Sequence, residues 1–161
     1  MLTIRLLYMG KTKFRWVHSG VTHYQRELKQ FAKLDIVEVK SLVGRYPDAE
    51  LMAKEAQRFK GNLQRGETVI CLDREGQRFT SDALARWLSS QFERAASLAF
   101  VIGGHYGIDP DFKRRAAATM SLSPMTYPHD LVRLMFTEQL FRAMSILGNH
   151  PYHKQTPARK K

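Results

Sequence analysis

Apolar residues along the chain follow two spacings, one typical of strands and one typical of helices. Short runs rich in branched apolar residues, or with every second residue apolar, predict strands at 2–9, 35–42, 67–73, 97–104 and 120–123. Apolar residues three or four positions apart predict helices at 16–32, 47–63, 80–92, 109–118 and 128–148. Strands and helices therefore alternate along the chain, which predicts an α/β fold with a parallel sheet and helices on both faces.

The same pattern predicts one domain, residues 1–150, followed by a basic tail at 151–161. A chain of 161 residues is long enough to bury a core, and 43% hydrophobic residues suit a folded protein. The run at 97–104 is apolar without alternation, so we expect this strand in the middle of the sheet. The single cysteine, Cys71, forms no internal disulfide, which favours an intracellular location.

The formal charge of +11 makes nucleic acid the first partner to consider and an anionic membrane the second. No apolar run reaches membrane-spanning length, so we expect no insertion into a membrane. Any one basic residue is more often a solvated surface charge than a phosphate contact. The candidates for phosphate contact are Lys11, Lys13, Arg15, Arg114, Arg115, Lys154, Arg159, Lys160 and Lys161.

Ligands of an open parallel sheet bind beyond the carboxyl ends of its strands. Three such ends stand out here: "CLDREG" around Leu72, "FVIGGHYG", and "SLSPMTYP". Glycines let the backbone approach a ligand closely, although a glycine cluster also simply makes a turn. The spacing matches no dinucleotide fingerprint, phosphate loop or serine-hydrolase elbow. The histidines are scattered without ligand spacing, so we expect no metal site.

The last predicted helix is apolar around most of its circumference, yet it carries Arg133, Glu138 and Arg142. Such a helix needs cover from the sheet and from a second subunit. Glu138 and Arg142 are four residues apart, and an exposed pair of this kind contributes only about 0.2–0.5 kcal/mol. Holding the pair within an apolar helix costs desolvation, which favours a role at a dimer interface or an active site.

Taken in order, the start "LYMGK", then "CLD", "FVIGGHYG", "SLSPMTYPHDLVRLMFTEQLFRA" and "PYHK" resemble the RlmH family of SPOUT methyltransferases. The resemblance spans essentially the whole chain. It implies methylation of N3 of a pseudouridine in a stem-loop of large-subunit (23S) ribosomal RNA, on ribosomal particles, with S-adenosylmethionine as donor. It also implies a homodimer in the cytoplasm and a sheet whose C-terminal segment forms a trefoil knot.

The family pattern places the cofactor contacts on the three strand ends. An adenine ring needs an apolar slot and a few backbone hydrogen bonds, which these segments can provide. Thr126 has a second possible role as the cap of the last helix. The implied cofactor contacts are Leu72, Gly103, Gly104, Ser123, Pro124, Met125, Thr126, Tyr127 and Pro128.

Methyl transfer to N3 requires the imide proton to leave, so a base or a nearby cation would help. The candidate catalytic residues are His129, Arg133, Glu138, Arg142, Tyr152 and His153, with no base assigned among them. The cofactor loop is poor in acid–base groups and the tail is rich in them. We therefore expect Tyr152, His153 and Lys154 to complete the site of the opposite subunit.

Three departures from the family pattern and two other functions stay open. The chain continues past "PYHK" into "QTPARKK". Phe141 stands where the family has tyrosine in "EQLYRA", and His105 occupies a variable position of the glycine loop. A SPOUT enzyme acting on another RNA, such as a tRNA, would carry the same cofactor motif. A non-enzymatic RNA-binding protein with this fold would bind no cofactor.

Overall fold

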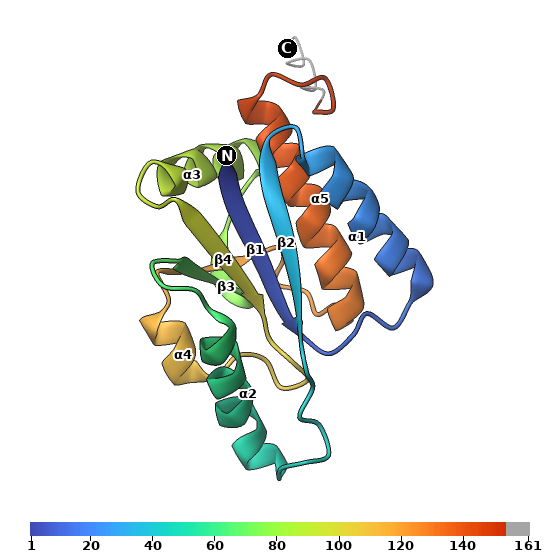
Figure 1. The fold of residues 1–161 in the computed structure, drawn as a ribbon, viewed down its shortest axis with the longest axis vertical. Coiled ribbons are helices and arrows are strands. Elements are labelled where there is room, and N and C mark those ends of the chain that lie inside the picture. The colour runs from blue at the N-terminus through green and yellow to red at the C-terminus, as the bar shows by residue number, and fades with distance from the viewer. Residues whose placement is uncertain (154–161) are drawn as a thin grey trace, which may run out of the picture.

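The computed structural model describes residues 1–153, in which strands and helices alternate from β1 to α5 (Figure 1). The strands are β1 (Leu2–Met9), β2 (Ala32–Val39), β3 (Thr68–Arg78), β4 (Ser97–Ile102) and β5 (Ala118–Ser121). The helices are α1 (Arg15–Leu28), α2 (Asp48–Asn62), α3 (Ser81–Phe92), α4 (Pro110–Arg115) and α5 (His129–Leu147). The predicted α/β alternation is confirmed.

The strands form one sheet in the order β2-β1-β4-β3-β5, and every neighbouring pair is parallel. The expectation that the apolar run at 97–104 lies mid-sheet is confirmed, because β4 lies between β1 and β3. From Leu98 to Ile102 its residues are 0–4% exposed. A strand covered on both faces needs apolar residues at every position, which explains the unbroken run.

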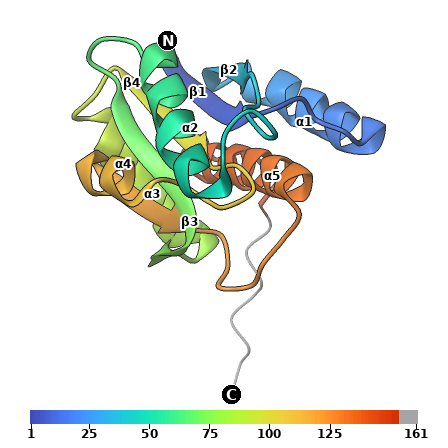
Figure 2. The same ribbon diagram turned by 90° about the horizontal axis from the view of Figure 1, so that it is seen from below.

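Helices cover both faces of the sheet and make a three-layer molecule (Figures 1 and 2). Alternate residues of a strand point to opposite faces. Leu6 and Tyr8 of β1 accordingly pack with residues of α1, α3 and α5, whereas Leu7 and Met9 pack with residues of α2 and α4. Gly20 of α1 allows α1 and α5 to pack closely, because a Cβ on Gly20 would lie 2.6 Å from the side chain of Leu134 in α5.

Several predicted boundaries were wrong, including those of β4, which ends at Ile102 rather than 104, and of β5, which spans Ala118–Ser121 rather than 120–123. Helix α1 ends at Leu28 rather than 32, and Ala32 already pairs with Leu2 as the first residue of β2. The second strand consequently spans Ala32–Val39 and not 35–42. Likewise α4 ends at Arg115, and Ala118 begins β5 by pairing with Ile70. In each case hydrogen bonds to a distant strand decide the boundary, and local spacing does not encode them.

Strand β3 is longer than predicted and contains a loop. Leu72 and Gln77 both pair with Met120 of β5, so residues 73–76 bulge out between them. Gly76 permits this return, because a Cβ on it would lie 2.6–2.8 Å from backbone atoms of Met120. The bulge keeps residues 73–75 beside the segment that leads to α5.

Candidate active site

A cavity of about 460 Å³ opens where β3, β4 and β5 end. Its wall combines residues 72–75, residues 102–107, residues 122–123 and residues 125–127, together with His129 and Val132 of α5. The three strand ends selected from the sequence are thus neighbours in the fold. The predicted cofactor residues in the wall are Leu72, Gly103, Gly104, Ser123, Met125, Thr126 and Tyr127. Pro124 and Pro128 belong to the same segment but do not line the cavity.

The 103–107 loop is as compact as its glycines allow. Gly107 has φ +88° and donates its amide to Gly104 O at 3.1 Å, which closes a tight turn. A Cβ on Gly103 would lie 2.5 Å from the carbonyl carbon of Gly107. The three glycines therefore present backbone to the cavity, beside His105 and Tyr106 of the same loop. Together with the apolar side chains of Leu72 and Ile102, this wall fits a flat heterocycle held by backbone groups.

The 121–128 segment is held by its own polar side chains. Ser121 Oγ donates to Ser123 O at 2.9 Å, and Ser123 Oγ accepts from Met125 N at 3.1 Å. Thr126 Oγ1 accepts from Arg74 Nη1 at 3.2 Å, which joins the segment to the bulge of β3. Thr126 does not cap α5, contrary to its second predicted role, because the capping position is Pro128 and it has no side-chain hydrogen bond.

Glu55 of α2 lies directly beneath the glycine loop, a position that no sequence pattern indicated. Its side chain is 3% exposed, and Oε1 has no hydrogen-bond partner within residues 1–153. A Cβ built on Gly104 would lie 2.6–2.7 Å from both carboxylate oxygens. Burial raises the pKa of Glu55, while the Gly104 amide and then His105 oppose that rise. Gly104 is therefore confined between the cavity and a buried carboxylate.

We expect Glu55→Gln to make the protein more stable at neutral and alkaline pH. A raised pKa means that the folded state holds a proton just above the ordinary carboxyl pKa of 4.5, where the unfolded state has released it. The free energy of unfolding of the wild type must then fall as pH rises through that window, and Gln removes the fall. Urea unfolding from pH 4 to 8 measures this. Glu50→Gln, on the exposed side of the same helix, is the control, and identical pH profiles for Glu55→Gln and wild type would contradict the expectation.

The candidate catalytic residues separate into two groups. His129 belongs to the cavity wall, and partial burial, followed by the Arg133 cation, lowers its pKa. Arg133 does not line the cavity: it is 3% exposed, and Nη2 donates to Met9 O at 2.6 Å. Its guanidinium also lies 3.8 Å from the centre of the Tyr8 ring and bonds Thr12 Oγ1 at 3.1 Å. Arg133 therefore holds the end of β1 against α5 and positions the wall.

Glu138, Arg142, Tyr152 and His153 form the second group, at the other end of α5. Tyr152 OH donates to Glu138 Oε1 at 3.0 Å, and Arg142 Nε donates to the same oxygen at 3.0 Å. His153 Nδ1 lies 3.4 Å from Arg142 Nη1. Burial and the bonds to Tyr24 and Glu138 raise the pKa of Tyr152, so its hydroxyl keeps its proton near neutral pH.

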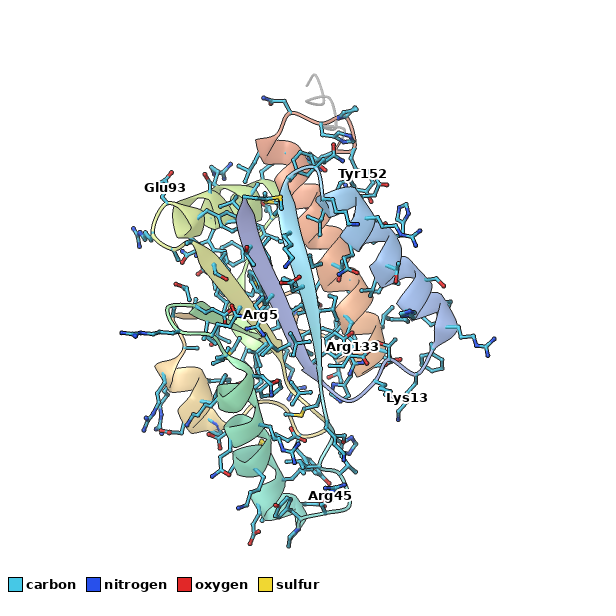
Figure 3. All side chains as sticks on the ribbon, viewed as in Figure 1. Arg5, Lys13, Arg45, Glu93, Arg133 and Tyr152 are labelled. Atoms are coloured by element: carbon cyan, nitrogen blue, oxygen red, sulfur yellow. The ribbon has the colours of Figure 1, made fainter. Side chains whose placement is uncertain are left out.

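The two groups are too far apart to act together within one chain. Arg133 and Arg142 are nine residues apart in α5, and a rise of roughly 1.5 Å per residue puts them about 13.5 Å apart along the axis. Figure 3 shows Arg133 near one end of α5 and Tyr152 beyond the other. Tyr152 and His153 of a chain thus lie away from the cavity of that same chain.

The predicted RNA contacts also lie in separate places. Lys11, Lys13 and Arg15 are exposed between β1 and the start of α1. Arg114 and Arg115 are exposed at the end of α4, and both bind Asp111, at 2.8 and 3.1 Å. The remaining candidates fall outside the described residues: Lys154, Arg159, Lys160 and Lys161.

Sequence reasoning missed part of the cavity wall. Asp73, Arg74 and Glu75 follow Leu72 directly, so the "CLDREG" strand end was a usable signal that was read too narrowly. Tyr106 and His105 were hidden between glycines of a recognised loop. No local pattern marked Glu55, because its position depends on α2 packing against the other face of the sheet.

Residues 1–153 contain no helix long and apolar enough to cross a bilayer, and no cluster of three or more His, Cys, Asp or Glu placed to hold a metal.

Comparison with known proteins decides the family. Residues 2–153 match the family described as "Predicted SPOUT methyltransferase". The chain belongs to the SPOUT methyltransferase family. Among curated members, "Ribosomal RNA large subunit methyltransferase H" of Geobacter sulfurreducens is 37% identical over 153 residues, covering 94% of this chain and 99% of the relative. The protein of the same name from Streptococcus equi subsp. zooepidemicus is 38% identical over 159 residues, and the match covers 95% of this chain and 100% of the relative.

These relatives confirm the resemblance seen in the sequence, because RlmH abbreviates their shared name. A solved structural neighbour is "a probable methylase family protein from Haemophilus influenzae Rd KW20". It has a TM-score of 0.52, covers 98% of this chain and 72% of its own, and is 12% identical. At that identity the likeness concerns the fold alone, and it agrees with the layered parallel sheet of this SPOUT methyltransferase.

Proposed function

We propose that the protein transfers a methyl group from S-adenosylmethionine to N3 of a pseudouridine in large-subunit ribosomal RNA. One observation carries the proposal. The cavity at the three strand ends is lined by the glycine loop and the 121–128 segment, in a chain 37% identical over its length to a ribosomal RNA large subunit methyltransferase H. Work on ribosomal particles would place the protein in the cytoplasm.

The cavity wall suits the cofactor. S-adenosylmethionine supplies a methyl group already activated by a sulfonium centre, so positioning provides much of the acceleration. Leu72, Ile102 and Met125 would hold the adenine, and the backbone of the 103–107 loop and of the 121–128 segment would orient the rest. We also propose the trefoil knot of the family for the C-terminal part of the single domain 1–150. The close passage of the β3 bulge and the 121–128 segment supports it.

The proton on N3 needs an acceptor near the cavity. His129 lines the wall, and its lowered pKa favours a neutral ring that can accept a proton. The Glu138–Arg142–Tyr152 group offers a second set of polar contacts for the substrate base. Because Tyr152 keeps its proton, it serves this proposal as a hydrogen-bond donor rather than as a base.

We propose that two chains share each site. The separation of about 13.5 Å along α5 keeps the tail of a chain from its own cavity. Leu131, Leu134 and Met135 remain partly exposed on α5, which suits a second copy packed against that helix. A homodimer with the tail motif of one chain at the cavity of the other would bring both groups of candidate residues to one substrate.

Mass mapping of nucleosides tests the proposed function. Large-subunit ribosomal RNA from a strain lacking this protein should contain one pseudouridine that lacks its N3 methyl group, and the wild-type gene should restore the modification. A gene carrying Thr126→Trp should not restore the modification, because the tryptophan side chain would occupy the cavity. A missing methyl group in tRNA instead would indicate another SPOUT activity. An unchanged nucleoside profile, with no cofactor binding in calorimetry, would indicate a non-enzymatic RNA-binding protein.

A further inference from the structure

Two large aromatic side chains are exposed to solvent at the start of α1. Phe14 is 50% exposed and Trp16 is 57% exposed, and neither belongs to the core. Their rings stack, with centroids 5.6 Å apart and planes inclined by 24°. Single exposed apolar residues need no explanation, but a stacked exposed pair is a flat apolar surface that usually marks a binding site.

The backbone beneath this pair is fixed. Asp130 Oδ2 accepts from Lys13 N at 2.6 Å and from Phe14 N at 3.0 Å. Asp130 is itself buried, and it adjoins His129 of the cavity wall. Asp130 therefore ties the backbone that carries Phe14 to the start of α5, one residue from His129 of the cavity wall. Figure 3 shows Lys13 and Arg133 close together at this corner of the molecule.

Three basic residues lie beside the two aromatic residues along the chain. Lys11, Lys13 and Arg15 are exposed, and in the part of the chain that the structure describes none of them forms a salt bridge. Two acidic residues contact the backbone of the segment: Glu38, whose Oε1 accepts from Thr12 N at 3.4 Å, and the buried Asp130. Aromatic faces interleaved with cations are the usual means of binding single-stranded nucleic acid, since bases stack on rings while phosphates meet the charges.

We propose that Phe14 and Trp16 form a stacking platform for an unpaired base of the RNA substrate, with Lys11, Lys13 and Arg15 holding the phosphates beside it. The proposal rests on the proposed function and adds how the enzyme grips RNA next to the target nucleotide. A second copy of the chain fits this surface less well, because a two-fold contact would bring the same three cations together from both subunits.

Fluorescence tests the stacking directly. The chain has two tryptophans, so Trp87→Phe leaves Trp16 as the single reporter. Titration with a short single-stranded oligouridylate should quench Trp16 emission, and a blunt RNA duplex of equal length should quench it far less. Replacing Lys13 with Gln should lower the slope of log affinity against log salt by about 0.7. Absence of quenching at low salt would overturn the platform.

Kinetics then tie the platform to the substrate. Phe14→Ala and Trp16→Ala should each raise KM for large ribosomal subunits from a strain lacking the protein about tenfold, as expected for one lost base stack. kcat and cofactor affinity should stay unchanged, and Trp16→Phe, which keeps an aromatic ring, should keep KM close to the wild-type value. Tyr46→Ala is the matched control, since Tyr46 is exposed at 38% in the connection before α2.

The outcomes separate the two proposals. Inactivity of the wild type on every RNA would defeat the proposed function. Methylation by the wild type with unchanged KM in Phe14→Ala and Trp16→Ala would defeat the platform alone. Loss of self-association in these variants by light scattering would assign the aromatic pair to the contact between subunits, and would also overturn the platform.

Discussion

A chain ending at Asn149 is expected to bind cofactor and form dimers but to lose methyl transfer by at least about 100-fold, the scale of one missing hydrogen-bond donor at the reacting base. The truncation removes Tyr152 and His153, which contact Glu138 and Arg142 and lie away from their own cavity. It leaves the sheet and all helices intact, so the fold should survive. Calorimetry with S-adenosylmethionine and transfer of labelled methyl to ribosomal subunits measure the two properties separately.

The control is a chain ending at Lys154, which keeps the "PYHK" motif and should retain methyl transfer at saturating substrate. A mixture decides which subunit the tail serves. A truncated chain paired with a full-length Thr126→Trp chain should recover one working site per heterodimer, because one chain gives the cavity and the other gives the tail. An inactive heterodimer, isolated with two different affinity tags, would show that the tail acts in its own subunit or not at all.

Gly104→Val should abolish measurable cofactor binding, and Gly104→Ala should weaken it while destabilising the fold by about 1–3 kcal/mol. The first obstacle to a new side chain is the buried carboxylate of Glu55, 2.6–2.7 Å from the Cβ position. A side chain at position 104 therefore affects binding and stability through its clash with the Glu55 carboxylate as well as through any clash with the cofactor. Adding Glu55→Ala to Gly104→Ala should recover part of the stability, so the two free-energy changes should not add.

Urea unfolding of the single and double variants measures this coupling, and calorimetry shows whether cofactor binding returns with it. Gly61→Ala is the matched control, because a Cβ at Gly61 meets nothing within 4 Å and alanine favours the helix. Strictly additive free energies for Gly104→Ala and Glu55→Ala would mean that the carboxylate does not confine the loop.

The sequence by itself determined the order of the elements, the central place of β4 and the segments that meet at the cavity. These features can be read from short stretches of sequence. A continuously apolar run such as "SLAFVI" indicates a strand buried on both faces, and the residues that follow each such run mark the strand end. The motifs around Leu72, Gly104 and Ser123 also carried the family. Nothing nonlocal was needed to find the three strand ends, since all parallel strands end at the same edge.

Only the tertiary structure decided where α1 gives way to β2, and why Gly104 has no room for a side chain. Both depend on partners far away in the chain: Leu2 for Ala32, and Glu55 for Gly104. Only the tertiary structure shows that His129 lies apart from the Glu138–Arg142–Tyr152 group, and that Arg133 is buried and donates a hydrogen bond to Met9 O. Spacing along a helix shows which side chains share a face, but packing against strands and neighbouring helices decides what each of them touches.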